Sequence, residues 1–485
     1  MRVSAFAIAL GAVFGVLVTL QPISDSDLFW HLETGRRTLA GDLPRTDLFS
    51  WTASGTPVFT DQWLGDLALA AAKAIGDWRG VLALRATLVA ALVAIVVDTA
   101  LRSRPGRPIV AVVAALPAIA LSRFAWTDRP ELLALVCFAL LVRLLRGGDR
   151  ELILTIPLLF VWAQLHGSYA LGLGLILASC AARAIAEPRE RWRFVPIASF
   201  AVLMTLLTPS GLAAWTSSGG HFLAPPRYIA EEGVPDARTL PGVLFLMTLA
   251  LVIATSMLGR RATLREAAIL IPVAFVALSA ARHTPYLAIA ATSYFATSWP
   301  DPLAKWRSAS GELARPTEGP RAAGVPVAPE RRGSPRTDKR LRGSTLPRSS
   351  SGFGRSGVLV AAALSLAIAV GLADARVDER GYPTAALVAL PAGAGTFNQY
   401  DWGGYLIEYA PRTPVFIDGR LFPFVPDVLE DYRIIVSARP GWEDVIDRRG
   451  VRTILVRPTD PIAVRAPERG WHVAYQDPIA VVLVK

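Results

Sequence analysis

The sequence predicts a polytopic α-helical membrane protein with about eleven transmembrane helices and a small C-terminal extracytoplasmic α/β domain. Two features of composition predict this class: hydrophobic residues make up 53% of the 485 residues, and charged residues only 18%. A soluble chain carries about 25% charged residues and could not bury so much apolar surface. The same hydropathy excludes a disordered protein, and a content of two cysteines excludes a disulfide scaffold.

The first element is the apolar run at 1–21. It has no Ala-x-Ala cleavage site before Asp25, so it is predicted as a membrane helix and not as a signal peptide. Apolar windows predict the remaining spans near 79–101, 108–122, 130–145, 152–166, 168–186, 194–208, 242–258, 266–281, 284–299 and 357–373.

The net charge of +11 would suit nucleic-acid binding, anionic lipid or the positive-inside bias of membrane proteins. Its distribution favours the last. Loops on one side are rich in arginine, whereas the loop at 22–78 has four Lys and Arg against eight Asp and Glu. We therefore expect a multi-pass protein of the cell (inner or plasma) membrane with a cytoplasmic N-terminus and no nucleic-acid partner.

Composition divides the chain into four parts. Residues 1–299 form a transmembrane domain that includes the outer loop 22–78, and 357–373 form the last transmembrane helix. Between them, 300–356 is rich in Pro, Arg, Ser and Gly and is predicted as a basic, disordered cytoplasmic linker; a contact with RNA or anionic lipid is the alternative. Residues 374–485 alternate strand and helix patterns, with GTFNQY, PVFIDG, RTILVR and HVAYQDPIAVVLVK as the predicted strands.

The outer loop 22–78 holds the first group of residues that could carry chemistry. Asp25 and Asp27 lie just beyond the first span, and two carboxylates at this spacing can bind a divalent cation or act as a general base. His31 lies four residues after Asp27, where a helix would place its imidazole over that carboxylate. In the alternative interpretation, both aspartates cap the start of a helix.

The same loop carries a longer pattern, D-x-D-L-x-W-H-L-x-x-G followed by P-x-x-D-x-F-S-x-T, then G, then W-L. It resembles the first periplasmic loop of bacterial GT-C glycosyltransferases, which take a sugar from a polyprenyl-phosphate carrier. The resemblance implies that Asp25 or Asp27 deprotonates the acceptor hydroxyl. The matching residues are Asp25, Asp27, Leu28, Trp30, His31, Leu32, Gly35, Pro44, Asp47, Phe49, Ser50, Thr52, Gly55, Trp63 and Leu64.

Polar and cationic residues also stand at the outer ends of predicted spans. Trp162 to Gly167 resemble the W-x-N-x-H-G segment of the same family, with Gln164 in the Asn position, and Leu207 to Gly211 resemble its N-P-x-G segment. A guanidinium at that depth suits a lipid-linked phosphate, whereas snorkelling helix ends are the alternative. The donor-phosphate candidates are Arg129, Arg282, His166 and His283.

The external domain holds a third group. Asp401-Trp402-Gly403-Gly404-Tyr405 and Asp418-Gly419-Arg420 offer aromatic faces beside flexible turns, and such faces stack on sugar rings or peptides. Trp402, Tyr405, Asp418 and Arg420 are therefore acceptor-binding candidates. In the alternative interpretation, Trp402 and Tyr405 belong to the core and the glycines supply backbone freedom.

The expected function is that of an inverting integral membrane glycosyltransferase acting on a glycan, lipid or protein acceptor of the bacterial cell envelope. Its partners would be a polyprenyl-phosphate-linked sugar, that acceptor and membrane lipid. No cofactor is required by the sequence; if the reaction uses Mg²⁺ or Mn²⁺, Asp25 and Asp27 are the expected ligands. A transporter or flippase of envelope precursors and a non-catalytic envelope assembly protein remain as alternatives. The sequence has no P-loop, GxGxxG, HExxH or GxSxG motif.

Overall fold

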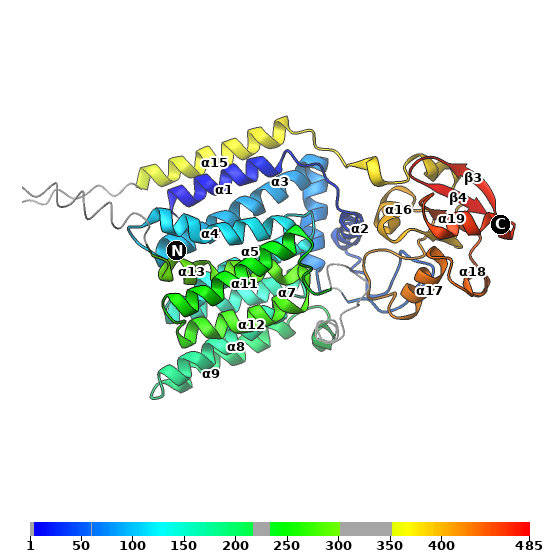
Figure 1. Ribbon diagram of the computed structural model, residues 1–485. Helices are drawn as coiled ribbons and strands as arrows, with labels where there is room; N and C mark the ends of the chain where they lie inside the picture. Colours follow the sequence, from blue (N-terminus) through cyan, green and yellow to red (C-terminus); the bar gives the residue numbers. More distant parts are fainter. Residues whose placement is uncertain (1–3, 60, 217–232, 301–351) are drawn as a thin grey trace, which may run out of the picture.

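The computed structural model describes residues 4–59, 61–216, 233–300 and 352–485. The described chain is mostly helical and has one small sheet near the C-terminus. Helices form a helical body, and the C-terminal domain lies at one end of it (Figure 1). Helix α1 starts at the opposite end of the helical body, whereas the C-terminus lies in the C-terminal domain. The linker predicted at 300–356 lies almost wholly outside the described residues.

The helices of the helical body begin and end near the positions that the sequence predicts. Local signals set several boundaries: Ser4 caps α1, proline stands at the first position of α4 and α5, and Thr263 and Glu266 form a capping box on α12. The helices are α1 (Ala5–Val18), α3 (Trp63–Ser103), α4 (Pro108–Ser122), α5 (Pro130–Leu145), α6 (Asp149–Ile153), α7 (Thr155–Leu165), α8 (Tyr169–Ala186), α9 (Phe194–Leu206), α11 (Leu240–Leu258), α12 (Leu264–Ser279), α13 (Thr284–Ser298) and α15 (Gly352–Leu372).

Four of these described helices are long and apolar enough to cross a membrane, which is consistent with membrane association. They are α3, α8, α11 and the continuous stretch Pro108–Ala125. The prediction of about eleven spans is therefore not confirmed. A helix rises 1.5 Å per residue, so about 20 residues are needed to cross the hydrocarbon. The hydropathy windows average over helix ends, and several apolar helices stop short: α7 ends after 11 residues and α9 after 13.

Helix α3 is kinked at Gly76 and Asp77, and Asp77 has a positive φ of 51°. The segment before the kink packs on α2 (Leu28–Leu39), and the segment after it enters the helical body. The span predicted at 79–101 thus begins just beyond the kink. The hydropathy pattern predicts the segment after the kink but not the helical segment that precedes it.

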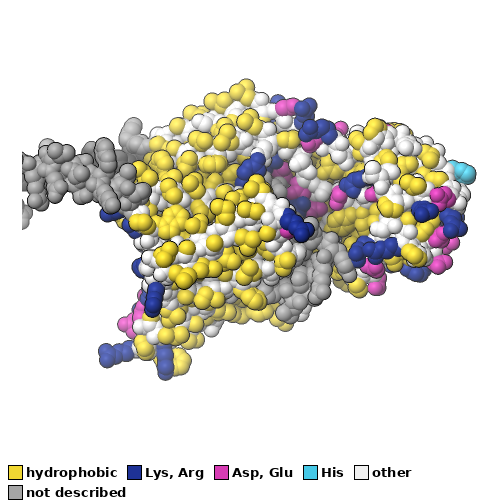
Figure 2. Space-filling model, in the orientation of Figure 1, with side chains coloured by type: hydrophobic (Ala, Val, Ile, Leu, Met, Phe, Trp, Pro, Cys, Tyr) yellow, Lys and Arg dark blue, Asp and Glu magenta, His cyan; other side chains and the backbone are white. Residues whose placement is uncertain are grey.

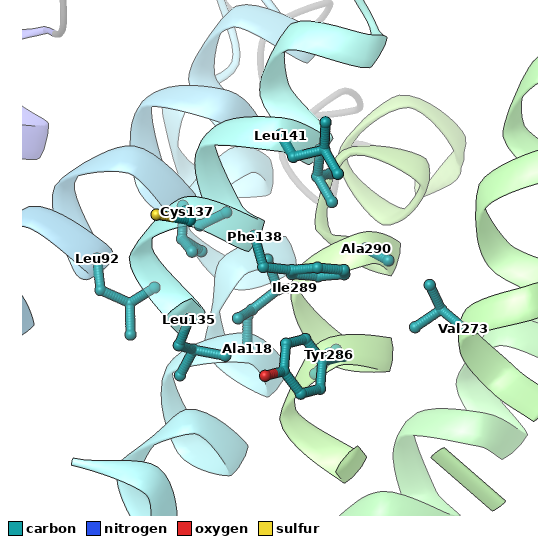
Figure 3. Packing of buried hydrophobic residues seen from close by; sticks show 14 of the residues in the cluster. Leu92, Ala118, Leu135, Cys137, Phe138, Leu141, Val273, Tyr286, Ile289 and Ala290 are labelled. Atoms are coloured by element: carbon teal, nitrogen blue, oxygen red, sulfur yellow. The ribbon is translucent and has the colours of Figure 1, made fainter. Parts of the chain in front are cut away.

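A single hydrophobic cluster fills the helical body. Phe138 of α5 lies edge-on to Tyr286 of α13, with ring centroids 4.7 Å apart (Figure 3). Leu135, Ile289 and Val273 surround the two rings. Cys137 and Cys180 are both buried free thiols, as the sequence predicts for small apolar side chains. On the face shown in Figure 2, hydrophobic side chains cover most of the helical body, and charged side chains lie at its junction with the C-terminal domain, over that domain and at the opposite end of the body.

The C-terminal domain contains a four-stranded sheet in the order β1-β2-β4-β3. The pair β1–β2 is parallel, and β4 is antiparallel to both β2 and β3. Short helices surround the sheet. The strands are β1 (Thr396–Asn398), β2 (Thr453–Val456), β3 (His472–Gln476) and β4 (Val481–Val484), and the helices are α16 (Gly403–Tyr409), α17 (Asp427–Val436), α18 (Trp442–Arg449) and α19 (Pro461–Arg465).

The strand predicted at PVFIDG is wrong. Val415 forms an isolated parallel bridge with Ser50 of the outer loop and does not join the sheet. The side chain of Asn398, at the end of β1, takes the place of backbone pairing: its Oδ1 accepts from Phe416 N at 2.7 Å, and its Nδ2 donates to Ile417 O at 2.9 Å. The run PVFIDG has the apolar pattern of a strand because Val415, Phe416 and Ile417 are buried. The backbone of Val415, however, is hydrogen-bonded to Phe49 and Trp51 of the outer loop.

The outer loop and the C-terminal domain share one hydrophobic core. Phe29 of α2 is fully buried and lies 5.5 to 5.7 Å, between ring centroids, from Tyr382, Tyr405 and Tyr409. Ile23 and Val377 form a second bridge between the two segments. Loop residues far from the C-terminus in sequence therefore fold against it, directly beside the helical body.

Candidate functional site

The two aspartates that follow α1 share one arginine. Arg129 Nε donates to Asp25 Oδ2 at 2.6 Å, and Arg129 NH1 lies 3.2 Å from Asp27 Oδ2. The backbone N–H of Asp27 donates to Asp25 Oδ1 at 3.0 Å. The Asp25 side chain is 6% exposed, that of Asp27 18% and that of Arg129 25%. Asp27 is thus the carboxylate of the pair that a ligand reaches more easily.

Helix capping does not explain this pair. Asp27 stands at the N-cap of α2, but its side chain makes no capping hydrogen bond. Asp25 does hold a backbone N–H, in the turn that leads into the helix. A carboxylate that does not cap is available for another role, so the capping alternative fits Asp25 in part and does not fit Asp27.

The structure corrects the predicted partner of His31. Its backbone N–H bonds to Asp27 O, but its ring nitrogen Nδ1 lies 2.6 Å from Asp66 Oδ1, and both side chains are buried. The imidazole is therefore held by Asp66 and does not orient the Asp27 carboxylate. Sequence reasoning missed Asp66. Asp66 could have been singled out as a lone acidic residue one helical turn after Trp63. The helix that carries it packs against α2.

A buried ion pair between Arg85 and Asp128 supports the group of Asp25, Asp27 and Arg129. Arg85 NH1 donates to Asp128 Oδ2 at 2.9 Å, and other N–H groups of Arg85 donate to the carbonyls of Gln21 and Pro22. Arg85 thereby fixes the chain just before Asp25, while Asp128 is the neighbour of Arg129. Burial raises the pKa of Asp128 to about 6; the charge of Arg85 opposes this rise, and that of Asp25 adds to it.

The other donor-phosphate candidates form a second group. His166 Nδ1 lies 2.9 Å from Ser168 Oγ, and Ser168 is hydrogen-bonded to the hydroxyl of Tyr286. The His283 ring lies 6.1 Å from that of Tyr286, and Arg282 lies near enough to act on Tyr286 electrostatically. Residues from three helix ends therefore meet around Ser168 and Tyr286.

The first turn of α3 joins the two groups. Trp63 Nε1 donates to Gln164 Oε1 at 3.0 Å, next to His166. A side chain at Gly65 would meet Pro130, which follows Arg129, and also the carbonyl of Leu165. The acidic pair with Arg129 and the group around His166 consequently lie at the same end of the helical body.

Of the four acceptor-binding candidates, Trp402, Tyr405 and Asp418 are buried in the C-terminal domain, and the side chain of Arg420 is 10% exposed. Trp402 Nε1 donates to Gly381 O at 2.8 Å, and Tyr405 stacks on Tyr382 at 4.5 Å. Arg420 is ion-paired with Asp418 and with Asp47 of the outer loop. The prediction that Trp402 and Tyr405 present faces to a ligand is wrong, because burial in the core hides both rings, and the core interpretation holds for them.

Asp25 and Asp27 were also the predicted ligands of a divalent ion. Their carboxylates face the guanidinium of Arg129, whose single positive charge offsets one of their two negative charges. Within the described ranges, no three His, Cys, Asp or Glu side chains converge as metal ligands. Metal binding by Asp25 and Asp27 stays a prediction.

Comparison of the chain with protein-family models and with curated proteins finds no match.

Proposed function

We propose that the protein is an integral membrane glycosyltransferase of the GT-C type. It would move a sugar from a polyprenyl-phosphate carrier to a glycan, lipid or protein acceptor at the outer face of the cell membrane. The observation that carries the proposal is the group Asp25, Arg129 and Asp27. It joins the start of α5 in the helical body, where Arg129 is the N-cap residue, to the C-terminal domain, where Gly419 lies against Asp27. Half-buried charges at the end of apolar helices are costly and are usually retained for function.

In this proposal Asp27 is the general base. It is the more exposed of the two carboxylates, and its Oδ2 is oriented by Arg129. Asp27 takes the proton of the acceptor hydroxyl, the acceptor oxygen bonds to C1 of the sugar, and the carrier phosphate leaves with the electron pair of the broken C1–O bond. Proton transfer by a positioned carboxylate typically contributes 10²–10⁴-fold to rate.

The donor phosphate would bind in the group around Ser168 and Tyr286. Arg282, His166 and His283 bring N–H donors and positive charge to one place, which suits the charge that develops on a leaving phosphate. Arg129 was expected in the same role. Its ion pairs with Asp25 and Asp27 support a different task for it, that of holding the base.

Glycan analysis of a deletion strain tests the proposal. Complementation with the wild-type chain should restore a missing envelope glycan or glycolipid, whereas Asp27→Ala should restore none and should leave a carrier-linked sugar to accumulate. Asp42→Ala is the matched control, because Asp42 is a solvent-exposed carboxylate of the same loop. Full restoration by Asp27→Ala would contradict the proposal and favour a transporter or an assembly protein.

A further inference from the structure

Two glycine-containing segments of the C-terminal domain have no part in the proposed chemistry: 402–405, at the start of α16, and the turn 418–420. Their aromatic and charged side chains are buried and satisfied within the fold. Their glycines, however, lie against the outer loop at Ser26 and Asp27. This contact joins the C-terminal domain to the acidic pair itself.

Gly419 makes the closest approach to the acidic pair. A Cβ added there would lie 1.8 Å from Asp27 Oδ1 and 2.7 Å from Asp27 Cγ, far inside van der Waals contact. A Cβ added at Gly404 would lie 2.2 Å from the carbonyl oxygen of Ser26. Neither glycine has a positive φ, so close packing, and not backbone conformation, favours glycine at both positions. At Gly404 the obstacle is a backbone carbonyl, whereas at Gly419 it is the end of the Asp27 side chain, which an added Cβ would displace.

The turn that carries Gly419 is firmly held. Arg420 lies between the carboxylates of Asp418 and Asp47, and its side chain is only 10% exposed. A Cβ at Gly403 would meet Ile417 O at 2.3 Å, which shows that the two glycine-containing segments pack directly on each other. A rigid support of this kind can fix the rotamer of a side chain that lies against it.

We propose that Gly419 and Gly404 are positioning residues for Asp27: Gly419 closes the space beside its carboxylate, and Gly404 packs on the carbonyl of Ser26 and so holds the backbone just before it. Oδ1 and Oδ2 thereby keep one orientation between Gly419 and Arg129. This inference rests on the proposed function for its catalytic consequence, because only then does the orientation of Asp27 set a rate. The C-terminal domain would thus complete the site without touching the substrate. A misplacement of about 1 Å in such a group can cost 10²-fold in rate.

A double-mutant cycle on thermal stability in detergent tests the contact without reference to activity. Gly419→Ala should lower the melting temperature in the wild-type background and have little effect in an Asp27→Ala background, because the clash is with the Asp27 side chain. Gly404→Ala should lower it equally in both backgrounds, because its clash is with a backbone carbonyl. Gly381→Ala is the control, since a Cβ there meets nothing within 4 Å. Equal losses for Gly419→Ala in both backgrounds would overturn the inference.

Turnover of the carrier-linked sugar in membranes tests the catalytic consequence. Gly419→Ala should lower kcat about a hundredfold and leave KM for the donor unchanged. Normal kcat in Gly419→Ala, with Asp27→Ala inactive, would overturn the positioning role. If Asp27→Ala itself leaves turnover and glycans unchanged, the proposed function fails and the catalytic inference falls with it, while the stability cycle still reports whether the contact exists.

Discussion

At the scale of single residues, the main finding is that charges far apart in sequence neutralise one another at one end of the helical body. Asp25 and Asp27 were predicted as a catalytic pair and Arg129 as a phosphate ligand, but the structure joins the three. Their place at one boundary could be predicted, because each flanks an apolar run. Their pairing could not, since a sequence does not show which helix ends are neighbours.

The partners that sequence reasoning missed are Asp66, Asp128 and Arg85. Asp66 and Arg85 are lone charges within apolar segments, and Asp128 directly precedes Arg129 at the start of another; none has a local pattern that shows its partner. Their roles depend on contacts between residues that are 35 to 67 positions apart. Only the packing of α1, α2, α3 and the turn before α5 brings them together.

Asp128 gives a prediction on pH. Its pKa is about 6 in the folded protein against 3.8 for the ordinary group, so the folded state binds the proton more tightly than the unfolded state does. Its contribution to stability is therefore greatest below about pH 4 and declines as the pH rises to about 6, by roughly 3 kcal/mol in total. The melting temperature of Asp128→Asn relative to that of the wild type, both measured in detergent, should therefore rise as the pH increases from about 4 to about 6. A constant difference from pH 4 to pH 7 would refute this account of Asp128.

At the scale of elements, the helix positions follow from the sequence and the lengths of the spans do not. The start of α5 at Pro130 and the capping box of α12 can be predicted locally. The break between α6 and α7 at Leu154 divides the apolar run predicted as one span at 152–166. In α3 the helix extends past the kink at Gly76 back to Trp63, well before the span predicted at 79–101.

The turn 418–420 gives a prediction at this scale. Arg420→Gln would leave Asp47 and Asp418 buried without a cation, at a cost of roughly 3–5 kcal/mol. Thermal unfolding should show this as a large fall in melting temperature. Arg457→Gln is the matched control, because its ion pair with Asp401 is solvent-exposed and should contribute about 1 kcal/mol or less. Equal losses for the two variants would contradict the role of Arg420 as a buried link between loop and domain.

At the scale of the whole molecule, the outer loop and the C-terminal domain form one folded unit. Their boundary in sequence is clear from composition, but the shared core is not, because Phe29 and Tyr405 are separated by most of the chain. The failed strand at PVFIDG has the same cause: its backbone partners, Phe49 and Trp51, lie in the loop. Long-range pairing is the part of this fold that the sequence does not reveal.

Phe29→Ala tests this shared core. Removing a buried ring costs roughly 3–5 kcal/mol, and Phe29 packs on three tyrosines of the C-terminal domain. Limited proteolysis of the variant should release the C-terminal domain faster than in the wild type, because the loop no longer holds it. Leu39→Ala, at a half-exposed position of the same helix α2, should leave the rate unchanged. An unchanged rate for Phe29→Ala would show that the two segments fold independently.

The central claim is that Asp27 acts as the base of a sugar transfer from a lipid carrier. The most direct measurement follows carrier-linked sugars by mass spectrometry in isolated membranes after their synthesis is blocked. With the wild-type chain, one carrier-linked sugar should disappear while free carrier phosphate rises; with Asp27→Ala, that sugar should persist. If every carrier-linked sugar decays at the same rate with the wild-type chain, with Asp27→Ala and without the chain, the protein does not consume such a donor and the account is contradicted.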